Sequence, residues 1–411
     1  MALAALSGWT KQQKLVVVAA FLGWSLDAFD FFLMVFVLKD IAQDFGTDVE
    51  AVSYALFLTL ASRPVGAFIF GRAADRWGRR PVLMVNILLY SMLGFASGFS
   101  SSLTMLLVLR TLFGVAMGGE WGVGSSLAME SIPVGARGVV SGLLQAGYPS
   151  GYLIASLAFW FLFPIIGWRG MLMLGALPAL LVVYIRSFVP ESPVWTAHAD
   201  TPHEPTLTTV AKHWKLALYL VVLMTAFNFF SHGSQDLYPT FLRVQLKFDS
   251  ATVGTIAVVY NIGAICGGIF FGNLSERIGR RRAIVIASLL ALPVLPLWAL
   301  STDPVLLGLG AFLMQICVQG AWGVIPAHLN ELSPPRARGT FPGFVYQLGN
   351  LIASYNATLQ SGIAERHGND YSMPLLLVVG VVAVVIAVIT GFGLEARGVS
   401  FHKQASPARA T

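Results

Sequence analysis

A polar run inside an otherwise apolar segment is where this sequence most clearly carries groups able to do chemistry. Between Asn228 and Thr240 the chain holds carboxamide, hydroxyl, imidazole and carboxylate side chains, at Asn228, Ser231, His232, Ser234, Gln235, Asp236 and Thr240. Polar groups buried in hydrocarbon are costly unless they face one another, water or a ligand. On a helix, Asn228, His232 and Gln235 share one face. This spacing predicts a polar stripe that lines a cavity.

Five further ionisable residues fall inside apolar segments: Asp27, Asp30, Arg63, Arg110 and Glu120. Asp27 and Asp30 share a helix face, so their mutual repulsion and burial favour a proton on at least one of them. Counting along the helices predicts that Asp30 and Arg110 meet at similar depth, with Asp27 and Arg63 as a second plausible pair. Three acids against two arginines leave one negative charge that a proton would cancel. We therefore expect Asp27 and Asp30 to couple proton movement to the movement of an anion.

Few cations are available to bind the carboxylate of such an anion. Arg110 is the first candidate, because its planar guanidinium can bind a carboxylate through two hydrogen bonds. His232 is the second, and Asn228, Ser231 and Gln235 could bind a hydroxyl or keto oxygen. Polar residues of the second half that could complete the cavity are Gln315, Gln319, Tyr346, Gln347, Asn350 and Asn356.

Each of these charged residues also has a structural interpretation. Arg63 and Arg110 could serve only as ion-pair partners of the aspartates. His232 could bond a backbone carbonyl, and Asp236 could orient His232 or cap the helix. Glu120 lies in a glycine-rich turn, where a structural role is favoured over binding.

The composition places the whole chain in a membrane. Hydrophobic residues make up 56% of it and charged residues only 11%, against roughly 25% charged residues in soluble domains. Apolar runs long enough to cross a bilayer predict twelve helices, at residues 16–38, 51–71, 81–100, 103–124, 138–163, 168–189, 214–239, 251–273, 282–301, 304–326, 340–363 and 371–394. We expect an all-α integral membrane protein with one six-helix bundle at residues 1–189, a cytoplasmic linker at 190–213 and a second bundle at 214–411.

The distribution of Lys and Arg predicts the orientation of these helices. With a cytoplasmic N-terminus, most basic residues fall in cytoplasmic segments, as the positive-inside rule requires. The net charge of +6 is then explained by topology, which disfavours a nucleic-acid partner. The first residues lack the pattern of a cleaved signal peptide. We expect a multi-pass protein of the plasma membrane, or of the inner membrane in a bacterium, with both termini cytoplasmic.

The two halves of the sequence repeat one another at a constant offset. The segment Gly71-x3-Asp75-Arg76-x-Gly78-Arg79-Arg80 becomes Gly272-x3-Glu276-Arg277-x-Gly279-Arg280-Arg281, and Trp121, Glu130, Arg137 and Gly138 become Trp322, Glu331, Arg338 and Gly339. Such a repeat predicts two pseudo-symmetric six-helix halves, related by an axis along the membrane normal, with a site between them.

These repeated segments resemble the signature loop of the major facilitator superfamily. In that family the loop latches the inner gate, and the resemblance assigns this role to Gly71, Asp75, Arg76, Arg79, Glu276, Arg277 and Arg280. Glycines allow helix ends to approach closely, and the acid and arginines form charge-assisted bonds. The alternative, that the arginines only obey the positive-inside rule, leaves the glycines and the repetition unexplained.

Further motifs narrow the resemblance. Arg137-Gly138, Arg338-Gly339 and Pro190-Glu191-Ser192-Pro193 look like those of sugar porters and metabolite symporters, and Arg63-Pro64-Val65-Gly66 and Gly118-Gly119-Glu120-Trp121-Gly122 are similar to organic-acid symporters. The polar run fits the pattern N-x-x-[ST]-H-x-[ST]-Q-D-x-x-x-T of JEN-type lactate and pyruvate permeases, a branch of the sialate:proton symporter family.

The resemblance implies a proton-coupled symporter that imports a small organic anion, such as lactate or pyruvate, by alternating access. A carrier of sialic acid or another organic acid is the first alternative, and a non-transporting membrane receptor is an alternative of another class. An enzyme is disfavoured, because no nucleophile and base pair, metal cluster or nucleotide-binding loop is recognisable. We expect no cofactor and no metal, a monomer in the lipid bilayer, and no disulfide between Cys266 and Cys317.

Overall fold

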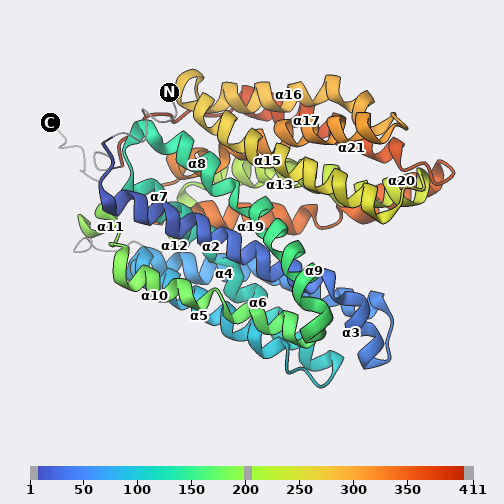
Figure 1. The fold of residues 1–411 in the computed structure, drawn as a ribbon. Coiled ribbons are helices and arrows are strands. Elements are labelled where there is room, and N and C mark those ends of the chain that lie inside the picture. The colour runs from blue at the N-terminus through green and yellow to red at the C-terminus, as the bar shows by residue number, and fades with distance from the viewer. Residues whose placement is uncertain (1–7, 199–205, 402–411) are drawn as a thin grey trace.

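The computed structural model describes residues 8–198 and 206–401, so the expected linker at 190–213 lies partly outside the described residues. All regular secondary structure in these residues is helical (Figure 1). The first half contains α2 (Lys11–Phe36), α3 (Leu38–Phe45), α4 (Val49–Trp77), α5 (Arg79–Ser97), α6 (Leu103–Gly118), α7 (Glu120–Ser131), α8 (Arg137–Gln145), α9 (Gly147–Met173) and α10 (Ala179–Phe188). Two short helices follow, α11 (Pro193–Thr196) and α12 (Thr206–Lys212).

The second half repeats this arrangement. It contains α13 (Trp214–Gln235), α14 (Tyr238–Thr240), a π-helical turn at Phe241–Gln245, α15 (Ser250–Ile278), α16 (Arg280–Ala299), α17 (Pro304–Trp322), α18 (Ile325–Leu332), α19 (Phe341–Ala353), α20 (Asn356–Arg366) and α21 (Ser372–Gly391). Figure 1 shows the halves side by side, one in blue to green and the other in yellow to red.

The expected apolar runs fall on helices, and the all-α fold class is confirmed. In the described residues, 10 segments are long and apolar enough to cross a membrane. The runs expected at 138–163 and 168–189 lie within one segment of 55 residues, which turns at Gly167, where φ is 60°. The run expected at 340–363 is divided between α19 and α20.

Two helices extend further than the sequence predicted. α4 runs to Trp77 and α15 to Ile278, whereas the expected runs ended at residues 71 and 273. Each helix stops where a glycine adopts a positive φ, 101° at Gly78 and 99° at Gly279, a conformation that other residues rarely adopt. The acids of the repeated motif, expected in loops, therefore lie on the last helical turns.

The halves meet most closely at the end of the molecule where α2 begins and α21 ends, which we call the terminal face. Here α4 packs on α19, and α8 packs on α15. The contact is largely backbone on backbone: a Cβ added to Gly122 would lie 2.8 Å from Gly343 Cα, and one added to Gly272 would lie 2.8 Å from Gly142 Cα. Large apolar side chains cover the outside of the bundles, among them Phe57, Trp160, Ile165 and Val305, as expected of a surface in lipid.

Candidate functional site

A cavity of about 440 Å³ lies between the two halves. The residues that line it come from α2, α4, α8 and α9 of the first half and from α13, α14, α15, α17 and α19 of the second, together with Asp236 after the end of α13. Those with polar groups are Trp24, Arg63, Gln145, Tyr148, Tyr152, Asn228, Ser231, His232, Gln235, Asp236, Tyr260, Asn261, Gln319, Trp322, Tyr346 and Asn350. A cavity between pseudo-symmetric halves is where a carrier of this architecture binds its cargo.

The polar stripe predicted on α13 lines this cavity. Asn228, Ser231, His232 and Gln235 all reach it. The stripe is connected to α17, because the Gln235 carboxamide donates a hydrogen bond to Gln315 Oε1 at 3.0 Å. The helical spacing places these side chains on one face, and the bond from Gln235 to Gln315 joins that face to the neighbouring helix.

His232 is held between two side-chain oxygens. Its Nδ1 lies 3.2 Å from Asp236 Oδ1 and its Nε2 lies 3.1 Å from Asn350 Oδ1 on α19. Both nitrogens donate to these oxygens when the imidazole carries a proton on each. Neither bond goes to a backbone carbonyl, and Asp236 orients the ring.

Arg63 brings a guanidinium to the cavity wall. The residue is 4% exposed and its carbon Cζ lies 5.3 Å from the centre of the Phe31 ring. Its Nη2 lies 2.8 Å from the Met117 sulfur, a weak acceptor, and its Nε has no hydrogen-bond partner. No carboxylate of the described residues forms an ion pair with it. Arg63 therefore presents a buried positive charge to the cavity.

Arg110 does not line the cavity, although the sequence made it the first candidate for the substrate carboxylate. It lies on α6, which packs on α4 and α5, and its guanidinium faces the Phe113 ring at 4.7 Å. Its Nε and Nη2 have no hydrogen-bond partner, and its electrostatic partner is Asp30. The structure does not bring Arg110 to the polar stripe, because none of the residues that line the cavity comes from α6.

The two aspartates of α2 are buried beside the cavity, not on its wall. Asp27 and Asp30 are 1% and 0% exposed, and each has at least one oxygen without a hydrogen-bond partner. Asp27 interacts electrostatically with Arg63 and with Glu120, which is also buried. Asp27 is thus an electrostatic partner of Arg63, which lines the cavity, and Asp30 is the partner of Arg110, which does not.

Aromatic side chains form much of the cavity wall. The Trp24 and Tyr148 rings lie 5.6 Å apart, and the Trp322 and Tyr346 rings lie 5.5 Å apart. Of these four, only Tyr346 was a cavity candidate from the sequence, and Trp322 entered there only as a position of the internal repeat. In a membrane protein an aromatic side chain can face lipid, the packed core or a cavity. The sequence therefore did not indicate that Trp24, Tyr148 and Trp322 line this cavity.

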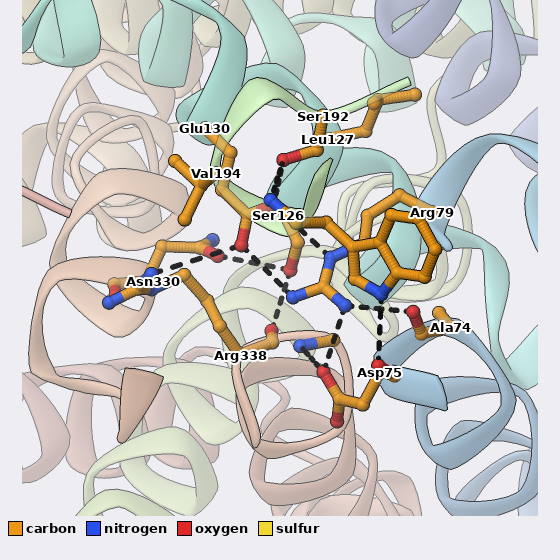
Figure 2. A network of polar contacts seen from close by, with 12 residues as sticks. Ala74, Asp75, Arg79, Ser126, Leu127, Glu130, Ser192, Val194, Asn330 and Arg338 are labelled. Atoms are coloured by element: carbon orange, nitrogen blue, oxygen red, sulfur yellow. Dashed lines mark hydrogen bonds and ion pairs between the residues drawn. The ribbon is translucent and has the colours of Figure 1, made fainter. Parts of the chain in front are cut away.

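The motif acid Asp75 links the two halves at the terminal face. Its carboxylate accepts hydrogen bonds from the Gly339 N–H at 2.7 Å, the Thr340 N–H at 3.1 Å and the Thr340 hydroxyl at 2.6 Å. Figure 2 shows Arg79 between this carboxylate and Glu130, at 3.1 Å from each. The Ser192 hydroxyl donates to Glu130 at 2.5 Å. Part of the expected linker therefore belongs to this network.

The second copy of the motif does the same from the other half. Glu276 accepts a hydrogen bond from the Gly138 N–H of the first half and pairs with Arg280 at 2.7 Å. Arg280 also pairs with Glu331 at 2.9 Å. Arg76 points away from this network, since it is exposed and lies 5.8 Å from the Trp77 ring. The backbone carbonyl of Arg277 accepts a bond from Arg397 at 2.6 Å.

Replacing Asp75 with asparagine should loosen the terminal face. The change removes the charge from an acceptor of three bonds to the other half, and hydrogen bonds to charged groups contribute about 1.5–3 kcal/mol each. Ala67, 2% exposed and facing Gly343 across the interface, can report opening as Ala67→Cys in a chain without Cys266 and Cys317. We expect a thiol reagent at the terminal face to label this introduced thiol about tenfold faster. Arg76→Gln is the matched control, and equal labelling in both variants would contradict the role of Asp75.

Comparisons with known proteins agree with this architecture. Residues 19–237 and 221–409 match the Major Facilitator Superfamily. The chain is 32% identical over 399 residues to a carboxylic acid transporter protein homolog of Saccharomyces cerevisiae, covering 90% of this chain and 64% of the yeast protein. It is 29% identical to the sialic acid transporter NanX of Escherichia coli, over 95% of this chain and 98% of that protein. A structure of the proton:xylose symporter XylE superposes with a TM-score of 0.76 at 17% identity, over 96% and 98% of the two chains. The chain belongs to the Major Facilitator Superfamily.

Proposed function

We propose that this protein is a proton-coupled symporter that imports a small monocarboxylate, such as lactate or pyruvate. The observation that carries the proposal is the Arg63 guanidinium, which lines the cavity and forms no direct ion pair with a carboxylate of the described residues. A buried guanidinium whose hydrogen-bonding groups lack a carboxylate acceptor is costly, and an incoming carboxylate would supply that acceptor through two charge-assisted hydrogen bonds. The names of the yeast and Escherichia coli relatives support an organic acid as cargo.

The rest of the cargo would be bound by the opposite wall. His232, Asn228 and Ser231 line the cavity from α13 and can donate to, or accept from, a hydroxyl or keto oxygen. A cargo held by Arg63 on one half and by α13 on the other touches both bundles at once. Such a cargo can favour the movement of one half against the other.

Asp27 would carry the coupled proton. Arg63 stabilises the Asp27 carboxylate while the cavity is empty, because the two interact electrostatically. A substrate carboxylate that reaches Arg63 adds a negative charge to a cluster in which Asp27 and Glu120 already interact with this one guanidinium, and a proton on Asp27 offsets the added charge. Asp30 and Arg110 form a second pair of opposite charges that does not line the cavity. Their charges would balance one another whether or not Asp27 carries the proton.

Alternating access would proceed by rocking of the two halves. The motif network closes the terminal face, while the cavity residues Val35 and Leu56 lie towards the other ends of α2 and α4. We assign the terminal face to the cytoplasm from the distribution of basic residues, so this conformation is closed to the inside. Because one chain forms the whole cavity, a monomer suffices.

A second candidate cargo is sialic acid or another large hydroxylated acid. The cavity of about 440 Å³ leaves room beyond a three-carbon acid, and Gln145, Asn261 and Gln319 add hydrogen-bonding groups to its wall. The relation to NanX also favours this alternative.

Uptake by purified protein in liposomes tests both candidates. We expect labelled lactate or pyruvate to accumulate when the outside is more acidic than the inside, and not when a protonophore collapses the gradient. Accumulation of sialic acid in place of the small acids would favour the second candidate. If no organic acid accumulates, or if the pH gradient has no effect, the proposed symport is wrong.

A further inference from the structure

Phe401 follows α21 in the chain and inserts between two arginines at the terminal face. Its ring is 1% exposed. The guanidinium carbon of Arg137 lies 3.4 Å from the ring centre, and that of Arg338 lies 3.7 Å from it. These arginines are equivalent positions of the internal repeat, one in each half. A cation facing an aromatic ring is attracted by the negative charge of the ring face, and here two cations use one ring.

The segment that carries Phe401 crosses from one half to the other. We call Glu395–Phe401 the C-terminal strap. At its start, Glu395 accepts a hydrogen bond from the Arg281 N–H at 3.0 Å, and Arg397 donates to the carbonyl of Glu276 at 3.1 Å, both in the second half. At its end, Phe401 packs in a hydrophobic cluster made almost entirely of first-half residues. Arg137 donates to the Val399 carbonyl at 2.7 Å, which fixes the strap to the first half.

The two arginines also reach acids of the opposite half. Arg137 lies 3.8 Å from Glu331, and Arg338 lies 3.8 Å from Glu130. Burial, the largest influence, lowers the pKa of Arg338 to about 10, so this residue stays charged at neutral pH. Both crossing pairs are longer than a hydrogen bond, so direct bonding to the acids does not fix the geometry by itself. The Phe401 ring adds a contact that both arginines share, and it also separates two like charges.

We propose that Phe401 is a positioning residue of the terminal-face gate, which holds Arg137 and Arg338 where they pair with acids of the opposite half. The strap thereby favours the state in which the terminal face is closed, and its ring must leave the two arginines before that face opens. Nothing in the motifs of the sequence assigns this role to the end of the chain. The inference depends on alternating access and not on the identity of the cargo, so it survives if the proposed substrate is wrong.

Two substitutions distinguish the effect of the aromatic ring face from the effect of apolar side-chain volume. Phe401→Leu keeps an apolar side chain but removes the aromatic face, whereas Phe401→Tyr keeps the face. In the chain without Cys266 and Cys317, Ala67→Cys reports opening of the terminal face. Leu56→Cys reports access to the cavity from the other side, since Leu56 lines it.

The expected results differ between the two reporter positions. Phe401→Leu should raise the labelling rate of the thiol at position 67 about tenfold and lower that of the thiol at position 56, because two desolvated cation–π contacts are lost. Phe401→Tyr should restore the parent rates at both positions.

The paired readout distinguishes a shifted gate from a damaged fold. A misfolded variant exposes both positions, while a shifted gate moves the two labelling rates in opposite directions. The proposal is overturned if Phe401→Leu labels like the parent, if both positions become more reactive, or if Phe401→Tyr behaves like Phe401→Leu.

Discussion

Replacing Arg63 with glutamine is expected to lower kcat/KM for monocarboxylate uptake by about two orders of magnitude. The glutamine retains hydrogen-bonding capacity but loses the charge, and hydrogen bonds to charged groups contribute about 1.5–3 kcal/mol, where each 1.4 kcal/mol is about tenfold. Arg63→Lys keeps the charge without the planar fork. It should raise the half-saturating concentration about tenfold while leaving the maximal rate closer to the parent value. Concentration dependence of uptake into liposomes measures both.

Arg110 provides the matched control for this prediction. It is a second buried arginine of the same half, it also lies over an aromatic ring, and it does not line the cavity. Arg110→Lys should leave the half-saturating concentration within about threefold of the parent value, because the charge opposite Asp30 is kept. If the half-saturating concentration rises more for Arg110→Lys than for Arg63→Lys, then Arg110, and not Arg63, binds the substrate carboxylate.

Asp27→Asn is expected to abolish accumulation driven by a pH gradient while exchange of labelled for unlabelled substrate continues. Asparagine resembles a protonated aspartate in shape and charge but cannot release a proton. The variant would therefore be fixed in the state in which Arg63 is available to the substrate. Accumulation should fall to equilibrium, and counterflow should stay within about threefold of the parent rate. Both can be measured on the same liposomes.

Asp30→Asn distinguishes this coupling role from a general need for buried acids. It leaves Arg110 without its electrostatic partner, and an unpaired buried charge is strongly destabilising. We therefore expect a lower thermal unfolding midpoint and loss of accumulation and exchange together. If Asp27→Asn shows this same joint loss and Asp30→Asn loses only accumulation, the proton is carried by Asp30.

Much of the fold could be predicted because the bilayer restricts the choices. Apolar runs of helix length, basic residues between them and a repeated motif require helices in two related halves. The predicted ends of α4 and α15 are too early because the hydropathy of the sequence falls several residues before each helix ends. α4 and α15 continue up to Gly78 and Gly279, where the backbone adopts a positive φ.

The site was predictable on α13 and much less so elsewhere. Asn228, His232 and Gln235 could be placed together because they share one helix and its periodicity sets their face. Arg63 and Arg110 lie on different helices, and depth along a helix says nothing about which helix faces the cavity. Only the packed structure, in which α4 supplies lining residues and α6 supplies none, shows which of the two arginines lines the cavity.

Two aromatic residues of the terminal face could not be found from the sequence. The Trp195 indole donates to the Asp75 carbonyl at 3.0 Å, and the Phe401 ring lies between two arginines. Each is a single aromatic residue outside the predicted helices. Neither periodicity nor the repeat therefore distinguishes them from the other aromatic residues of the chain.

The glycine contacts between the halves have a mechanical consequence. Gly122 meets Gly343, and Gly142 meets Gly272, so the two bundles touch there through smooth backbone instead of interlocked side chains. Under the proposed alternating access, such surfaces can separate without first withdrawing interdigitated side chains from one another. We therefore expect the ion pairs around these contacts, more than side-chain packing, to set the height of the kinetic barrier to opening the terminal face.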